Sequence, residues 1–237
     1  MSPDSFTKEN LDTYLKELAK EYRRVGGKAM PAEIILVGGA AILANYGFRE
    51  MTADIDAVIH SASSMKDAVN AVGNRFNLPR GWLNEDFVHT DSYSPKLDEL
   101  SVYYKSFYGV LSVRTIEAEY LIAMKLRSGR KYKNDLSDVV GILAEHKKRG
   151  LELTLEKINS AVKKLYGGWE CFPEDSRPFI ESALKNDDFE NIYRSVKSDE
   201  IESGDILLGF EKDYPKVAKQ SNINDILKAL KAKRGQG

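Results

Sequence analysis

The sequence predicts an α/β (α+β) fold, because strand-type apolar runs alternate with amphipathic helical patterns in its first half and helical patterns alone follow. Hydrophobic residues make up 42% of the 237 residues and charged residues 30%, proportions typical of a folded globular protein. The pattern changes near residue 150. We therefore expect an α/β domain over residues 1–150 and a helical region over residues 151–237.

Spacing of apolar residues predicts the elements of the first half. Apolar residues three and four apart indicate a helix over residues 7–24. A β-branched run over residues 33–39 predicts a buried strand that ends in two glycines, followed by a short helix over residues 40–46. Residues 53–59 predict the second strand, and the apolar face of residues 65–76 predicts a helix after it.

The middle of the chain predicts more strands and then helices. Residues 100–113, rich in aromatic and β-branched side chains, indicate one or two strands. Thr115 is a candidate N-cap for a helix that ends at Gly129, and a second helix begins near Asn134. Helical patterns alone follow, over residues 155–165, 178–196 and 223–230.

Composition excludes several classes of protein. A single cysteine, Cys171, cannot form an internal disulfide, which fits a reducing compartment. The first residues lack the basic start and apolar run of a signal peptide, and no run approaches the roughly 18 apolar residues of a membrane span. We expect a cytoplasmic protein. Its net charge of −1 gives no general attraction to nucleic acid, so a polyanion site requires local clustering of cations.

A pair of aspartates on the second predicted strand is the strongest indication of function. Side chains alternate along a strand, so Asp54 and Asp56 point the same way, with Cα atoms roughly 7 Å apart. Two carboxylates this close suit a shared Mg²⁺ or Mn²⁺ ion. On a buried sheet they require a cation or strong hydrogen bonds. We expect both to be catalytic metal ligands.

The glycine pair Gly38-Gly39 supplies the complementary half of a phosphate site. Without a Cβ, these residues let backbone N–H groups approach a phosphate, and the helix that follows adds positive potential. The spacing fits neither G-x-G-x-x-G nor a Walker A loop, which disfavours those two nucleotide folds. Arg49 and Thr52 stand between the glycines and the aspartates, and we place them in the same nucleotide-binding site.

A basic stretch forms the second candidate constellation. Residues 120–150 carry eight Lys or Arg against three Asp or Glu, which suits a bound polyphosphate or RNA. Within it, Lys125 lies in an apolar run, where a lysine is costly unless it reaches water or meets an anion. We expect Lys125 and Arg130 to belong to the nucleotide site.

Two further aspartates follow this basic stretch. Asp135 and Asp138 are three residues apart at the start of a helix and therefore share a face. Either of them is suited to orient a basic residue or to supply a third catalytic carboxylate. Asp98 and Glu99, at the entrance to a strand, are alternatives for the third carboxylate.

The segments LVGGAAILANYGFREMTADIDAVI and AMKLRSGRKYKNDLSDVVGIL carry a resemblance to a known family. In the order of their motifs they resemble the nucleotidyltransferase-fold proteins of the DNA polymerase beta superfamily, specifically the AbiEii-like bacterial toxin group and its uncharacterised relatives. The resemblance covers roughly residues 30–150. It implies a minimal mixed sheet flanked by helices, magnesium held by the D-x-D pair, and a nucleoside triphosphate donor.

The same resemblance implies an activity and partners. A nucleoside monophosphate would pass to an acceptor hydroxyl of RNA, such as tRNA, or of a protein, and the enzyme would be the toxin of a toxin–antitoxin pair. Lys125 would contact the triphosphate, and Asp135 and Asp138 match the acidic positions of the later helix motif. The superfamily often has Ser or Gly where this chain has Ala40, so only its backbone contacts phosphate. The alternative is a weak or inactive nucleotide- or partner-binding module on the same fold.

Overall fold

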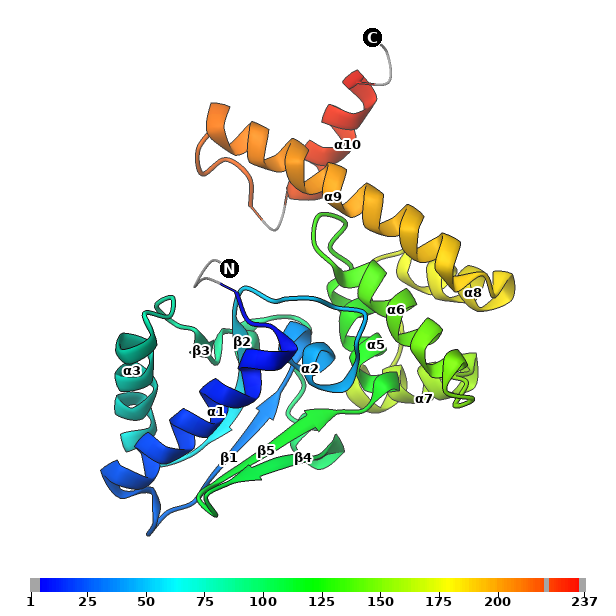
Figure 1. The fold of residues 1–237 in the computed structure, drawn as a ribbon. Helices are drawn as coiled ribbons and strands as arrows, with labels where there is room; N and C mark the ends of the chain where they lie inside the picture. The colour runs from blue at the N-terminus through cyan, green and yellow to red at the C-terminus, as the bar shows by residue number, and fades with distance from the viewer. Residues whose placement is uncertain (1–4, 220–221, 235–237) are drawn as a thin grey trace.

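A five-stranded mixed sheet forms the centre of the N-terminal half of the protein in the computed structural model, which describes residues 5–219 and 222–234 (Figure 1). The strand order is β3-β2-β1-β5-β4. The central strand β1 (Ala32–Leu36) pairs antiparallel with β2 (Ile55–His60) and parallel with β5 (Leu111–Ile116). The short β3 (Leu83–Asn84) lies parallel beside β2, and β4 (Ser101–Phe107) lies antiparallel beside β5. The predicted α/β class is confirmed.

Helices cover the sheet because each has one apolar face. α1 (Lys8–Tyr22) buries its leucines and lies across the sheet beside α3 (Ser64–Phe76) (Figure 1). α2 (Gly38–Asn45) is almost wholly apolar and is buried between the sheet and α5 (Ala118–Ser128). α6 (Asp135–Lys148) packs on α5. Short helical turns complete this half: Arg23–Gly27, Asp86–His89 and Leu97–Leu100 (α4).

Four helices form the described part of the C-terminal region, residues 151–219 and 222–234. They are α7 (Leu155–Tyr166), α8 (Ser176–Asn186), α9 (Phe189–Asp213) and α10 (Ile223–Arg234). α7 packs on α5, and the long α9 crosses α6 and carries α10 (Figure 1). The boundary predicted near residue 150 falls between α6 and α7, but one hydrophobic core continues across it. Within the described residues, no helix is both long and apolar enough to cross a membrane.

Several predicted boundaries differ from the structure. Gly38 and Gly39 form the first turn of α2 rather than the end of a strand, because β1 already ends at Leu36. Asp54 precedes β2 instead of lying within it. Thr115 is a buried residue of β5, and Glu117 occupies the N-cap of α5. The predicted end of this helix at Gly129 is confirmed by its left-handed backbone.

The sheet topology brings distant sequence motifs to one edge. Since β1 and β2 are antiparallel, the end of β1 and the beginning of β2 lie side by side. The backbone N–H of Val37 donates to the carbonyl of Asp56 over 3.0 Å. The first turn of α2 therefore lies beside Asp54 and Asp56 in the fold.

Candidate active site

Asp56 and the first glycine of α2 are in close approach. Asp56 is partly buried and Asp54 is exposed just before the strand. Gly38 has a left-handed φ of 55°, and a Cβ on it would lie 3.5 Å from Asp56 Oδ2. A side chain at position 38 would be strained by the backbone and would stand directly against the carboxylate.

Negative charge accumulates at this pair of aspartates. Burial and the charge of Asp54 raise the pKa of Asp56, while Lys125 and Arg130 act in the opposite direction. Among the described residues, neither aspartate forms an ion pair with a lysine or arginine. A divalent cation would satisfy both carboxylates, and Mg²⁺ typically takes one or two carboxylates together with substrate phosphates. The described residues contain no cluster of three or more metal-ligating side chains.

Gly39 allows two side chains to approach the start of α2. A Cβ on Gly39 would lie 2.5 Å from Thr52 Oγ1 and 3.0 Å from a terminal nitrogen of Arg49. The distance to Thr52 Oγ1 is shorter than a real Cβ contact, so a side chain at position 39 would have to displace Thr52 or Arg49. Ala40 is 1% exposed and its methyl group lies in the core, which leaves only its backbone for a ligand.

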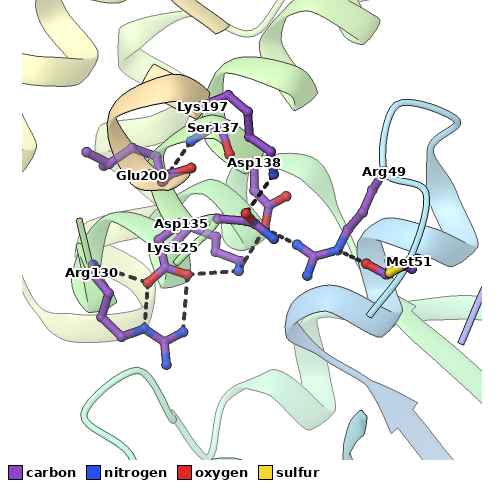
Figure 2. A network of polar contacts seen from close by, with 11 residues as sticks. Arg49, Met51, Lys125, Arg130, Asp135, Ser137, Asp138, Lys197 and Glu200 are labelled. Carbon is purple, nitrogen blue, oxygen red and sulfur yellow. Dashed lines mark hydrogen bonds and ion pairs between the residues drawn. The ribbon is translucent and has the colours of Figure 1, made fainter. Parts of the chain in front are cut away.

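A buried lysine joins the next two aspartates, as Figure 2 shows. Lys125 is 8% exposed, and its Nζ lies 2.9 Å from Asp135 Oδ1 and 2.9 Å from Asp138 Oδ2. Asp138 also accepts a 2.5 Å hydrogen bond from Arg49 Nη1. Asp135 accepts a 2.8 Å hydrogen bond from Arg130 Nε. Two carboxylates thus hold three cations.

The electrostatics of this network favour the charged forms of Asp135 and Lys125. Burial opposes ionisation of Asp135, but Lys125 and Arg130 outweigh it and lower the pKa of Asp135 well below its ordinary range. Burial likewise disfavours a charged Lys125, but Asp135 and Asp138 raise its pKa overall. Through Arg49, which contacts Asp138 and stands against Gly39, the network reaches the first turn of α2.

The four candidates for a third carboxylate fall into two groups. Asp135 and Asp138 lie in the lysine network. Asp98 and Glu99 lie in α4, where Asp98 pairs with His60 over 3.0 Å. His60 is four residues beyond Asp56 on β2, roughly 13 Å along the strand, so this pair lies at the other end of the sheet.

Sequence reasoning missed residues that approach from other elements. Asp86 contributes to the raised pKa of Asp56, because β3 places Asn84 directly beside Asp56. Glu200 of α9 accepts hydrogen bonds from the backbone N–H groups of Leu136 and Ser137 at 2.9 and 3.2 Å. No local pattern marks Glu200, since it lies 64 residues after Leu136.

Comparison with known proteins identifies the class. A family model described as "Nucleotidyltransferase of unknown function (DUF6036)" matches residues 13–147, more than half of the chain. The matched span includes the glycine pair, both aspartate pairs and Lys125. No curated protein and no solved structure gives a significant match.

Proposed function

The chain belongs to this nucleotidyltransferase family, and from that premise we propose that it moves a nucleoside monophosphate from a nucleoside triphosphate to an acceptor hydroxyl. One observation carries the proposal. A glycine pair at a helix start, two aspartates that form no ion pair with a lysine or arginine among the described residues, and a group of cations meet at one edge of the sheet.

Asp54 and Asp56 would hold the divalent cation, Mg²⁺ or Mn²⁺. A cation bound there would supply charge neutralisation for the triphosphate oxygens and help align the reacting groups. Asp56 supports this assignment, because burial and Asp54 make its charge unfavourable without a positive partner.

Residues of the chain supply the remaining features of a triphosphate site. The first N–H groups of α2 have no partner within the helix, and Gly38 and Gly39 leave them open to phosphate oxygens. Arg130 has a side chain 33% exposed, so it can reach a ligand while it holds Asp135. Lys125 is more deeply buried and would act chiefly through its fixed positive charge. Catalysis of phosphoryl transfer depends mainly on such positioning and electrostatic stabilisation.

We assign different roles to the remaining carboxylates. Asp138 and Asp135 are already occupied by Lys125, Arg49 and Arg130, and so they serve to position these cations. Asp86 is exposed and lies near enough to Asp56 to affect its pKa. Asp86 is therefore our candidate to accept the proton of the acceptor hydroxyl.

The proposed acceptor is RNA, such as tRNA, with protein as the alternative. The excess of lysine and arginine over residues 120–150 supports a polyanionic partner, although the whole chain is nearly neutral. By resemblance to the AbiEii-like group, we propose that the protein is a toxin held in check by an antitoxin protein.

The deciding experiment incubates the protein with each α-labelled nucleoside triphosphate, Mg²⁺ and total RNA. We expect label in RNA with wild type and not with Asp56→Asn. Asp98→Asn is the matched control, because it removes a carboxylate at the opposite end of β2. Nucleotide binding that Asp56→Asn abolishes, without any transfer by wild type, would indicate the inactive binding module instead.

The toxin role has its own test. Induced expression of wild type in bacterial cells should arrest growth, while the same level of Asp56→Asn should not. Equal growth arrest by both proteins would contradict a toxin that acts by nucleotidyl transfer. It would favour a role for the helical region independent of the aspartates.

A further inference from the structure

The helix α6 begins without a cap of its own. Its N-cap residue Asn134 makes no capping hydrogen bond with its side chain. Asn134 Oδ1 instead accepts a 2.7 Å hydrogen bond from Lys197 Nζ of α9. The N–H groups of Leu136 and Ser137, at the second and third helical positions, are those that an N-cap side chain normally satisfies.

Glu200 provides the missing cap from a distant helix. It stands one turn after Lys197 on α9, and its Oε1 accepts from both N–H groups (Figure 2). Glu200 is only 3% exposed, and its Oε2 has no hydrogen-bond partner among the residues that the structure describes. The C-terminal region therefore completes the helix that carries Asp135 and Asp138.

The charge of Glu200 is costly in this environment. Burial and the neighbouring charge of Asp138 raise its pKa to about 7, although the N–H groups of Ser137 and Leu136 lower it. Tyr193, also on α9, and Arg49 border the same group of charges. A glutamine would accept the same two hydrogen bonds without a charge, so the carboxylate is not required for packing alone.

The cap determines what the aspartates of α6 can bind. Asp side chains in a first helical turn readily accept hydrogen bonds from nearby free N–H groups. Because Glu200 occupies those groups, Asp135 and Asp138 remain directed at Lys125, Arg130 and Arg49. Loss of the cap would free two donors that compete with Lys125 for the same carboxylates.

We infer that Glu200 is a positioning residue for nucleotidyl transfer, which couples the C-terminal helical region to the Lys125 network by capping α6. The inference rests on the proposed function for its effect on rate. The coupling itself, between Glu200 and Lys125, can be measured in the absence of substrate.

Kinetics test the effect on rate. Since an N-cap contributes about 0.5–2 kcal/mol, Glu200→Ala should lower kcat between about twofold and thirtyfold. Wild-type kcat should rise between pH 6 and 8 as the cap becomes charged, and Glu200→Gln should lack that step while remaining folded. Glu202→Gln, an exposed change on the same helix, is the control. Unchanged kcat in Glu200→Ala, or the same pH step in Glu200→Gln, would overturn the inference.

A double-mutant cycle separates this inference from the proposed function. The unfolding midpoints of Glu200→Ala, Lys125→Met and their combination are compared, with Glu202→Gln in place of Glu200→Ala as the control cycle. We expect the combined shift to be clearly smaller than the two single shifts together, and the control cycle to be additive. Additive shifts for Glu200→Ala and Lys125→Met would refute the coupling, even if the wild-type protein catalyses nucleotidyl transfer. Non-additive shifts in a protein that shows no transfer would refute the proposed function and leave the coupling intact.

Discussion

Two aspartate pairs lie in one site, and their electrostatic surroundings are opposite. Asp54 and Asp56 form no ion pair with a lysine or arginine among the described residues, and the pKa of Asp56 is raised by burial and by Asp54. Asp135 and Asp138 hold Lys125, Arg130 and Arg49, and the pKa of Asp135 is lowered. Within the described residues, the first pair has no cationic side chain bound directly to it, whereas the second pair binds three.

The difference favours Asp54 and Asp56 over Asp135 and Asp138 as the pair that accepts a cation from solution. A metal at Asp135 and Asp138 would have to displace buried ion pairs, whose disruption costs about 3–5 kcal/mol. A metal at Asp54 and Asp56 would relieve repulsion that already exists. We therefore propose that aspartates bind the metal ion at one pair, Asp54 and Asp56, and hold cationic side chains in place at the other, Asp135 and Asp138.

The largest expected effect is on activity at the first pair. Asp56→Asn should reduce nucleotidyl transfer by about a hundredfold or more, because several kcal/mol of transition-state stabilisation depend on the charge it places there. Stability should be unchanged or higher, since the charged form is disfavoured in the folded protein. Transfer assays measure the loss of activity and thermal unfolding measures the stability, with Asp98→Asn as the control for both. A clear loss of stability in Asp56→Asn would contradict the proposed difference between the two aspartate pairs.

The second pair should show the reverse behaviour. Asp135→Asn leaves Lys125 and Arg130 short of a buried partner, so we expect destabilisation by about 3 kcal/mol in denaturant unfolding. The matched control is Asp175→Asn, which breaks an exposed pair with Lys131 and should cost below about 1 kcal/mol. Equal destabilisation by Asp135→Asn and Asp175→Asn would show that the buried ion pairs of Asp135 contribute no more to stability than an exposed pair.

The pH dependence of stability should separate Asp135 from Glu200. Asp135 has a lowered pKa, so its contribution is complete above the unfolded value of 3.8 and is lost as the pH falls below it. Glu200 has a pKa raised from 4.5 to about 7, so its contribution is complete below pH 4.5 and is lost as the pH rises through 7. Glu200→Gln should match wild type near pH 5 and be more stable by roughly 1–3 kcal/mol at pH 8. If the stability of wild type and of Glu200→Gln changed in parallel between pH 5 and pH 8, the raised pKa of Glu200 would be contradicted.

The smallest expected effect on activity comes from Gly39, which lies against Arg49, the residue that connects the two aspartate pairs. Gly39→Ala would place a methyl group against Thr52 and Arg49, at a cost of about 1–3 kcal/mol from overpacking. Displacement of Arg49 from Asp138 should lower transfer activity while both aspartate pairs remain. Gly47→Ala is the control, since its Cβ would meet nothing within 4 Å. If both variants behave alike, Arg49 does not connect the two pairs.

Local patterns predicted much of the fold. Helical spacing located α1, α3, α6 and α7 within a few residues, because each buries one continuous apolar face. The predicted ends of β1 and β2 were less accurate than those of the helices. Gly38 and Gly39 lie inside α2, since a glycine pair in sequence does not distinguish a strand end from a first helical turn.

The candidate site divides in the same way. Residue patterns alone mark Gly38-Gly39, Asp54, Asp56 and Lys125 as unusual, because each departs from its apolar surroundings within a few residues. The folded structure was needed to find that Lys125 is bound by Asp135 and Asp138, that Arg49 joins Asp138, and that Glu200 caps α6. These partners could not be predicted because most of them lie far apart along the chain. Charge pairing and burial depend on which elements meet in space, and a local pattern contains no information on a partner 64 or 89 residues away.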